Sequence, residues 1–335
     1  VDQALGLTEV RALRRIRPHL NVIQLHDIIF DKKSGRLCLV FELMDLNMYE
    51  LLKARQKPLP EFRVKNYMYQ LLSSLHHIHR HGIFHRDVKP ENLLIRDNLL
   101  KLGDFGSCRG INTKRPYTEY ISTRWYRPPE CLLTSGHYSY KMDMWAAGCV
   151  FFEALTNLPL FPGSSEIDQI NKIHNVLGTP KPSVLAKLRR HRRLVGVDFG
   201  FEPRPGLGLA ALCPGASPDA LQLLSALCAY EEEDRPSSKA ALRSPYFHDL
   251  RLAEQRFQQV SSQGQRTASS SKHSCPSPIS RVDDTTPELH TRERKKALML
   301  PNMGMKGSRS PLHCKTNRSV NLPPIAGRRA KRKKK

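Results

Sequence analysis

Two short polar segments near the middle of the 335-residue chain carry side chains suited to phosphoryl transfer. Residues 85–92 read His-Arg-Asp-Val-Lys-Pro-Glu-Asn, and residues 104–106 read Asp-Phe-Gly. Phosphoryl transfer requires little covalent chemistry from a protein, but it requires an oriented hydroxyl and neutralisation of negative charge. Asp87 can orient an attacking hydroxyl, and Lys89 can reach the phosphate that moves. These two residues are therefore the candidate catalytic residues.

Two further side chains can bind a metal ion. Asn92 ends the first segment with an amide oxygen, and Asp104 begins the second with a carboxylate. Both residues are candidate magnesium ligands, because Mg²⁺ favours oxygen ligands. The apolar runs 93–95 and 99–102 lie between them and predict two short strands.

The residues around these segments predict a small strand-containing part followed by a larger helical part. Residues 20–44 contain two apolar runs around a polar turn, which is typical of a β-hairpin. Residues 5–17 favour a short helix that Pro18 ends, and apolar residues over 64–82 recur at the spacing of a long amphipathic helix. Three more helices are expected over 142–155, 168–177 and 219–229. This order of elements indicates the α+β class.

The positive charge of the chain is concentrated in its C-terminal tail. The formal net charge is +23, and residues 251–335 contain 20 Lys and Arg against 5 Asp and Glu. The tail is rich in Ser, Pro, Gln and Arg and has no hydrophobic period, which is typical of disorder. We therefore expect a folded domain over residues 1–247 and a disordered basic tail over 248–335. No apolar run approaches the roughly 18 residues of a membrane helix, so no membrane contact is expected.

The end of the tail, residues 327–335, contains seven basic side chains. Such a run fits an importin-binding signal for nuclear import, and a solvated, solubilising end is the alternative. A nucleic-acid-binding protein is a third interpretation of the charge. It is disfavoured because no nucleic-acid-binding module accompanies the run, and aromatic residues for base stacking are almost absent from the tail.

The catalytic and metal-binding candidates together resemble the catalytic loop and the Asp-Phe-Gly motif of protein kinases. Residues 123–130, Thr-Arg-Trp-Tyr-Arg-Pro-Pro-Glu, are similar to the end of a kinase activation segment, with Pro-Pro-Glu in place of Ala-Pro-Glu. Arg235 matches the arginine that kinases pair with Glu130, and Asp143 matches the aspartate that braces the catalytic loop. The resemblance covers nearly all of the first 250 residues. It implies a bilobal kinase fold with a complete helical C-terminal lobe and a truncated N-terminal lobe.

Other motifs resemble the proline-directed (CMGC) group of protein kinases, which includes cyclin-dependent and MAP kinases. Arg127 and the stretch 161–180 are similar to this group, and residues 118–120, Thr-Glu-Tyr, resemble the dual-phosphorylation motif of MAP kinases. Gly103 before the metal aspartate and Phe84 before the catalytic loop most resemble the family of MAPK/MAK/MRK-overlapping kinases.

This resemblance implies a serine/threonine protein kinase with ATP and Mg²⁺ as cofactors, which transfers the γ-phosphate of ATP to Ser or Thr of protein substrates before proline. Arg127 is implied to contact the substrate. Phosphates on Thr118 and Tyr120 would add negative charge to the activation segment. Arg86 and Arg109 can pair with that charge and order the segment, so an upstream activating kinase is an implied partner. The resemblance also implies a location in the cytoplasm and nucleus, and in the cilium.

The resemblance further implies a nucleotide-binding cleft. Glu42 and Met44 correspond to the hinge whose backbone holds adenine, and Leu94 corresponds to the floor beneath it. Glu9 corresponds to the helix glutamate that pairs with a strand lysine. That lysine and a glycine-rich loop belong upstream of Glu9, where only eight residues stand, and no Gly-x-Gly-x-x-Gly occurs in the chain. We therefore expect a truncated sequence of low activity, and the alternative function is a catalytically dead kinase that acts as an interaction scaffold.

Overall fold

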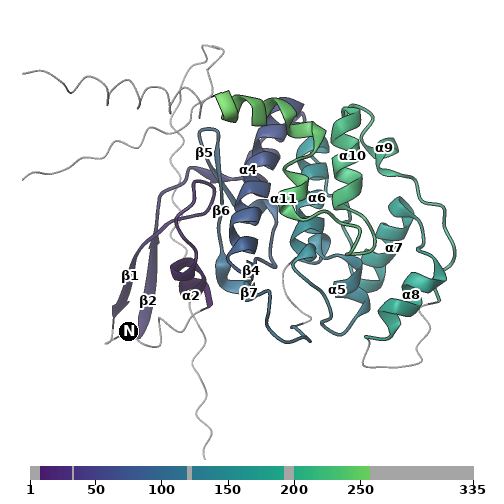
Figure 1. Ribbon diagram of the computed structural model, residues 1–335, viewed down its shortest axis with the longest axis horizontal. Coiled ribbons are helices and arrows are strands. Elements are labelled where there is room, and N and C mark those ends of the chain that lie inside the picture. The colour runs from purple at the N-terminus through teal and green to yellow at the C-terminus, as the bar shows by residue number, and fades with distance from the viewer. Residues whose placement is uncertain (1–7, 32–33, 119–122, 192–199, 257–335) are drawn as a thin grey trace, which may run out of the picture. The chain divides into compact units, whose positions relative to one another are not determined.

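The computed structural model describes residues 8–31, 34–118, 123–191 and 200–256. Within these ranges, a helix and a β-hairpin come first, short strands and two further helices follow up to residue 110, and helices without strands follow from residue 129 (Figure 1). This order confirms the expected mixed α/β architecture, in which a small strand-containing part precedes a larger helical part.

The first described elements are helix α2 (Thr8–Arg15) and the antiparallel strands β1 (Leu25–Asp31) and β2 (Arg36–Phe41). The predicted helix and hairpin are confirmed in these positions, and Gln24 still bonds to Glu42 across the hairpin, but residues 21–23 pair elsewhere. Val22 instead bridges to Leu102, and the amide of Ile23 donates a hydrogen bond to the Leu102 carbonyl at 2.9 Å. The apolar run before β1 therefore joins the hairpin to a second group of strands.

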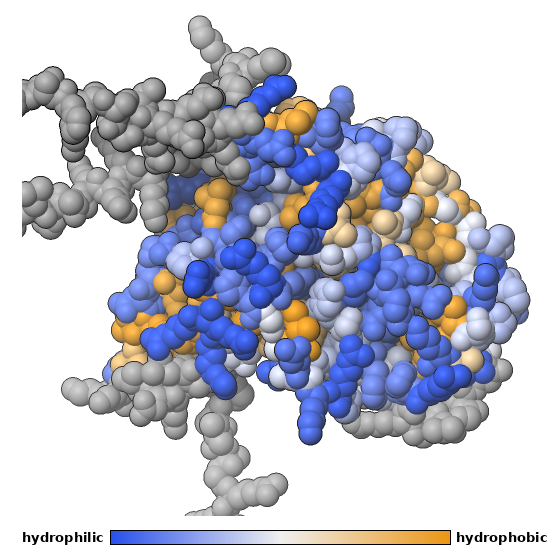
Figure 2. Space-filling model, viewed as in Figure 1, coloured by the Kyte–Doolittle hydropathy of each residue, from blue (hydrophilic) through white to orange (hydrophobic). Residues whose placement is uncertain are grey.

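The hairpin keeps apolar side chains at the surface. Ile29 is 53% exposed and Val40 is 38% exposed, and Figure 2 shows apolar side chains at this end of the described residues. A groove of about 790 Å³ follows β1 and is also lined by Leu13 and Ile16 from α2 and the segment after it. Along β2, half-buried and exposed residues alternate, so this strand buries only one face.

Two small antiparallel sheets carry the segments that the sequence assigned to catalysis. Strands β3 (Leu46–Asn47), β5 (Leu93–Arg96) and β6 (Leu99–Leu102) form one sheet, and β4 (Ile83–Phe84) pairs with β7 (Arg109–Gly110). The two predicted short strands are confirmed as β5 and β6. Leu93 pairs with Leu102. This register brings the residue before β5 and the residues after β6 to the same end of the sheet.

Two long helices form the centre of the helical part. These are α4 (Glu61–Arg80), whose buried face carries apolar residues at helical spacing, and α6 (Lys141–Thr156), which is buried along most of its length. Gly82 follows α4 at φ 73° and turns the chain into β4. The other helices are α3 (Met48–Lys53), α5 (Pro129–Leu133), α7 (Glu166–Leu177), α8 (Pro182–Arg189), α9 (Leu209–Leu212), α10 (Pro218–Leu227) and α11 (Ser238–Ala241). The four longer helices expected from the sequence are confirmed as α4, α6, α7 and α10.

Helical structure continues beyond α11, over residues 248–256, and contacts α4. Lys65 pairs with Asp249 at 3.1 Å, and the Tyr69 hydroxyl donates a hydrogen bond to Glu254 at 2.8 Å. The predicted domain boundary at residue 247 stays a prediction. Among the residues described, no helix is both long enough and apolar enough to cross a membrane.

Candidate active site

Asp87 lies at the centre of the predicted site, in the loop between β4 and the short 3-10 helix η1 (Pro90–Asn92). Its Oδ2 accepts hydrogen bonds from Lys89 Nζ at 2.8 Å and from Asn92 Nδ2 at 3.1 Å. Its Oδ1 is buried and has no hydrogen-bond partner among the described residues. An unpaired buried acceptor is costly. A hydroxyl donor from a bound molecule therefore fits this position.

One carboxylate from α6 fixes the backbone of this loop. Asp143 is buried and accepts hydrogen bonds of 2.8 Å from the amides of His85 and Arg86 and from His79 Nε2. Burial alone would raise the pKa of Asp143, but the hydrogen bond and charge of His79, together with the His85 amide, hold that pKa below its usual value. Asp143 therefore stays ionised. Its bonds hold Arg86 at φ 71°, a conformation that costs energy for a residue with a side chain.

His85 connects the catalytic loop to the Asp-Phe-Gly segment. Its Nε2 donates a hydrogen bond to the Gly103 carbonyl at 2.9 Å, since a carbonyl can only accept. Its Nδ1 is then free to accept the Asp87 amide at 3.3 Å, and its ring lies edge-on to Phe105 at 5.0 Å. The His85 ring therefore fixes the distance between the backbone of Asp87 and the segment that carries Asp104.

The two predicted metal ligands meet at the end of the β5–β6 hairpin. The amide of Gly103 donates to the Asn92 carbonyl at 2.9 Å, which places Asp104 next to Asn92 in space. Asn92 uses its Nδ2 on Asp87, so its amide oxygen is left for another partner. Asp104 is exposed, and its Oδ1 accepts the Gly106 amide at 3.2 Å. An amide oxygen and a carboxylate so placed fit Mg²⁺.

Glu9 of α2 reaches the same segment. Its carboxylate accepts a hydrogen bond from the Phe105 amide at 3.3 Å. Burial and the neighbouring charge of Asp104 raise the pKa of Glu9. Within the described ranges Glu9 has no ion pair with a lysine. The residues present therefore fit a metal ion, whereas a lysine to hold a triphosphate beside Glu9 is not among those described.

The predicted hinge lies beside the predicted floor of the cleft. Met44 is half-buried against the core, and the following strand β3 pairs Asn47 with Leu94. The Glu42 carboxylate accepts hydrogen bonds from Lys101 Nζ and from the Gln24 amide, both at 2.8 Å, and the Glu42 amide donates to the Gln24 carbonyl at 3.0 Å. The structure thus brings Glu42, Met44 and Leu94 together. Their role in adenine binding stays a prediction.

The predicted regulatory residues are described only in part. Thr118 is exposed, and its carbonyl accepts a hydrogen bond from the Tyr138 hydroxyl at 2.8 Å. Tyr120 lies outside the described residues. The Arg86 guanidinium is buried and donates to the Ser107 carbonyl at 2.6 Å and to the Tyr138 hydroxyl at 3.0 Å.

The end of the activation segment is fastened by a buried ion pair. Arg235 donates two hydrogen bonds to the Glu130 carboxylate, at 2.6 and 2.7 Å, and its guanidinium lies 5.0 Å from the ring of Trp145. The pairing that the kinase resemblance implied is therefore present. Arg127, the predicted substrate contact, is buried and lies 3.5 Å from Glu166 at the start of α7.

Two contacts near the site have no signal in the sequence. The Tyr126 hydroxyl donates to Glu153 of α6 at 2.7 Å, and burial raises the pKa of Glu153 to about 6. The Tyr138 hydroxyl joins Arg86, which is 52 residues away in the chain. A spacing of this length has no periodicity that a sequence pattern could reveal.

The fold and the groups around Asp87 have the arrangement that the resemblance to protein kinases implied. The family model for the protein kinase domain matches residues 2–247. The chain therefore belongs to the protein kinase domain family, as the sequence motifs indicated.

Three relatives describe its position within this family. The chain is 54% identical over 256 residues to the MAPK/MAK/MRK overlapping kinase of Homo sapiens, a match that covers 76% of this chain and 60% of the relative. It is 44% identical to the serine/threonine-protein kinase MAK of Mus musculus, over 73% of this chain and 39% of the relative. It is 39% identical to cyclin-dependent kinase F-3 of Oryza sativa subsp. japonica, over 74% of this chain and 56% of the relative. The predicted similarity to MAPK/MAK/MRK-overlapping kinases is confirmed, and the match spans 60% or less of the length of these relatives.

Proposed function

We propose that the chain is a serine/threonine protein kinase that transfers the γ-phosphate of ATP to Ser or Thr residues of proteins, at sites followed by proline. The observation that carries this proposal is the unpaired Oδ1 of buried Asp87, flanked by Lys89 and the metal-binding candidate Asn92. Serine and threonine as the phosphate acceptors are supported by the similarity to the serine/threonine-protein kinase MAK and to the MAPK/MAK/MRK overlapping kinase.

In this proposal the residues of the chain position the substrate hydroxyl and neutralise the negative charge of the phosphate. Asp87 Oδ1 accepts the hydrogen bond of the substrate hydroxyl, and its direction is fixed because Lys89 and Asn92 hold the other oxygen. The ammonium group of Lys89 lies 2.8 Å from the Asp87 carboxylate. Its positive charge would therefore stabilise a phosphate that approaches a hydroxyl bound at Asp87. Asn92 and Asp104 would hold Mg²⁺, which supplies neutralisation of the phosphate charge when bound.

The proposed regulation is phosphorylation of Thr118 and Tyr120 by an upstream kinase. Arg86 supports it, because its guanidinium is buried and its hydrogen-bond partners among the described residues are the Ser107 carbonyl and the Tyr138 hydroxyl, both uncharged. A phosphate brought close to such a cation gains a charge-assisted hydrogen bond, which is among the stronger kinds.

Phosphate transfer from ATP to paired peptides tests the activity. One peptide carries Ser-Pro and its partner carries Ser-Ala at the same place, and both are incubated with the full chain and Mg²⁺. We expect faster transfer to the Ser-Pro peptide. Asp87→Asn should lower kcat by about 10²- to 10⁴-fold, because the hydroxyl loses its oriented acceptor. Equal kcat values for the parent chain and Asp87→Asn would overturn the assignment of Asp87.

A second candidate function is a non-catalytic interaction module with a kinase fold. The observation that favours it is Glu9, whose carboxylate faces the like charge of Asp104 and has no lysine partner in the described part of the chain. Calorimetric titration with ATP and Mg²⁺ separates the two functions. Binding that Asp104→Asn weakens supports the kinase, whereas no binding together with no phosphate transfer supports the scaffold.

The proposed organisation is a kinase domain over residues 1–247 and a basic tail over 248–335. The basic end at 327–335 would recruit importin, giving a nuclear as well as a cytoplasmic location, with the cilium a further proposed location. A fluorescent fusion of the full chain is compared with one that lacks 327–335. Loss of nuclear signal on deletion supports import by this segment, and an unchanged distribution contradicts it.

A further inference from the structure

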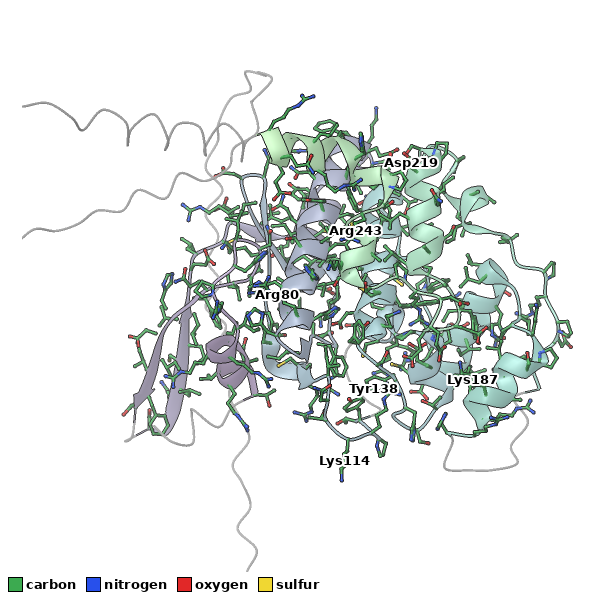
Figure 3. All side chains as sticks on the ribbon, viewed as in Figure 1. Arg80, Lys114, Tyr138, Lys187, Asp219 and Arg243 are labelled. Carbon is green, nitrogen blue, oxygen red and sulfur yellow. The ribbon has the colours of Figure 1, made fainter. Side chains whose placement is uncertain are left out.

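Tyr138 joins two parts of the site that the sequence separates. Its side chain is fully buried, in the segment just before α6, and lies near Lys114 (Figure 3). The hydroxyl accepts a hydrogen bond from Arg86 Nη1 at 3.0 Å and donates one to the Thr118 carbonyl at 2.8 Å. A single oxygen therefore links the residue before Asp87 to the residue that begins the Thr-Glu-Tyr motif.

On the catalytic side, Arg86 extends the connection in two directions. Its Nε donates to the carbonyl of Ser107, which directly follows the Asp-Phe-Gly segment, at 2.6 Å. Its amide is fixed by Asp143 at 2.8 Å. A displacement of the Arg86 side chain would therefore act on both the catalytic loop and the metal-binding segment.

On the activation-segment side, the chain is pressed against Tyr138. The rings of Tyr117 and Tyr138 lie 5.1 Å apart, and the Tyr117 amide donates to the Gly136 carbonyl at 2.8 Å. A Cβ at Gly136 would lie 2.1 Å from the Tyr117 carbonyl oxygen, and Gly136 has φ 73°. Glycine is thus required at residue 136 for this approach. The contact also sets the position of Thr118.

We propose that Tyr138 is a positioning residue, whose hydroxyl holds Thr118 and Arg86 in register so that a phosphate on Thr118 acts on the catalytic loop. The positioning role rests on the proposed kinase function, whereas the hydrogen-bonded link itself does not. Packing alone requires only the ring of Tyr138. The two bonds require a group that both donates and accepts, and the hydroxyl is the only such group on this side chain.

The hydroxyl keeps its proton under physiological conditions. Burial raises the pKa of Tyr138 to about 12, although the charge of Arg86 acts in the opposite direction. The donor to Thr118 is therefore present near neutral pH, and the link is not itself a pH switch there.

Amide hydrogen exchange of the full chain tests the link without requiring activity. Tyr138→Phe removes only the hydroxyl. Tyr117→Phe is the matched control, because it removes a hydroxyl of the same ring cluster whose partners, in the described part of the chain, are the carbonyls of Ile111 and Thr113. We expect Tyr138→Phe to speed exchange about fivefold in both 85–92 and 105–118, which is the scale of one lost hydrogen bond. Tyr117→Phe should affect 111–118 alone. Unchanged exchange in 85–92 for Tyr138→Phe, or equal effects of the two variants there, overturns the link.

A second measurement tests the positioning role. Thr118→Glu supplies a negative charge at the activation segment in the parent chain and in Tyr138→Phe. We expect the charge to slow exchange in 85–92 in the parent chain and to have no effect there in Tyr138→Phe. In the transfer assay, Tyr138→Phe should lower kcat about tenfold and leave KM for the peptide unchanged. A response to Thr118→Glu that survives in Tyr138→Phe overturns the role. If the parent chain transfers no phosphate, the proposed function fails, and the exchange comparison still decides the link.

Discussion

The catalytic loop and the N-terminal region of residues 8–41 hold their side chains in opposite ways. Around Asp143, buried donors and acceptors satisfy one another at 2.8 Å, and the loop keeps a strained backbone at Arg86. In residues 8–41, Ile29 and Val40 remain exposed, and Glu9 faces a like charge. The difference shows that the backbone of the catalytic loop is fixed by Asp143 of α6, whereas residues 8–31 and 34–41 have no comparable buried network among the described contacts. We therefore expect the same carboxylate-to-amide exchange to have very different effects in the two regions.

The largest effect is expected for Asp143→Asn. An amide cannot accept all three hydrogen bonds as a carboxylate does, and breaking a buried charged network should lower the free energy of unfolding by about 3–5 kcal/mol. Urea unfolding followed by tryptophan fluorescence measures the loss. The matched control is Asp219→Asn, an exposed aspartate in the first turn of α10, with an expected loss below about 1 kcal/mol. Equal losses for the two variants would contradict the central role of Asp143.

The next effect is expected for Glu130→Gln. The substitution leaves the Arg235 charge buried without its anion, and the nearby Trp145 ring compensates only in part. We expect a loss of about 3 kcal/mol in the same unfolding measurement. Glu166→Gln is the control, since the Glu166 side chain is 44% exposed and lies 3.5 Å from Arg127, and such pairs contribute about 0–1 kcal/mol. A loss that is no larger for Glu130→Gln than for Glu166→Gln would show that the buried pair does not fasten the segment.

A smaller, pH-dependent effect is expected where residues 8–41 meet α4. The His19 ring stacks on His77 at 4.4 Å, and burial together with the charges of His77, Arg80, Lys101 and His76 lowers the pKa of His19 to about 4. The unfolded chain binds a proton near pH 6.5, whereas the folded chain resists it until about pH 4. Stability that is fully present above pH 6.5 is therefore lost as the pH falls toward 4.

The pH effect is measured by urea unfolding at pH 7.5, 6.5 and 5.5. We expect a loss of roughly 1 kcal/mol between the first and last pH, after allowance for solvent screening. The variant His19→Asn should reduce this dependence without abolishing it, because burial also lowers the pKa of His174 to about 4, while His248→Asn, at an exposed histidine, should leave it unchanged. A parent-like slope in His19→Asn would exclude the buried imidazole as its source.

The smallest effect, and one of opposite sign, is expected for Glu9→Gln. Gln keeps an acceptor for the Phe105 amide and removes the repulsion with Asp104 that contributes to the raised pKa of Glu9. The free energy of unfolding at pH 7.5 should therefore be unchanged or rise by up to about 0.5 kcal/mol. A large loss would mean that residues 8–41 are held at Glu9 as tightly as the catalytic loop is held at Asp143, and the contrast between the regions would fail.

Much of the fold could be predicted from the sequence because its signals are local. The periodic apolar face of α4 and the apolar runs of β5 and β6 fix these elements within a few residues. The hairpin prediction is wrong for residues 21–23, because an apolar pattern of this kind fits any strand. Their pairing with Leu102 depends on a contact far away in the chain. The short helices α5, α8, α9 and α11 have too few turns to show a period.

The candidate site likewise contains residues that local sequence signals reveal and residues that only the structure reveals. Asp87, Lys89, Asn92 and Asp104 were identified by residue type and spacing, because loop and hairpin hold them within a short stretch. Tyr138 could not be identified, since its hydroxyl acts across 52 residues and tyrosine is common in buried clusters. The candidate catalytic residues can thus be identified from local sequence, whereas the hydrogen bonds that position them connect residues far apart in the chain.

The contacts of Asp143 have one more consequence, for how the loop can change over evolution. Asp143 recognises the main-chain amides of residues 85 and 86 and not their side chains. Every amino acid except proline offers the same amide. Substitutions at these two residues can therefore keep both bonds to Asp143, even where they lose the side-chain bonds that His85 makes to Gly103 and that Arg86 makes to Ser107 and Tyr138.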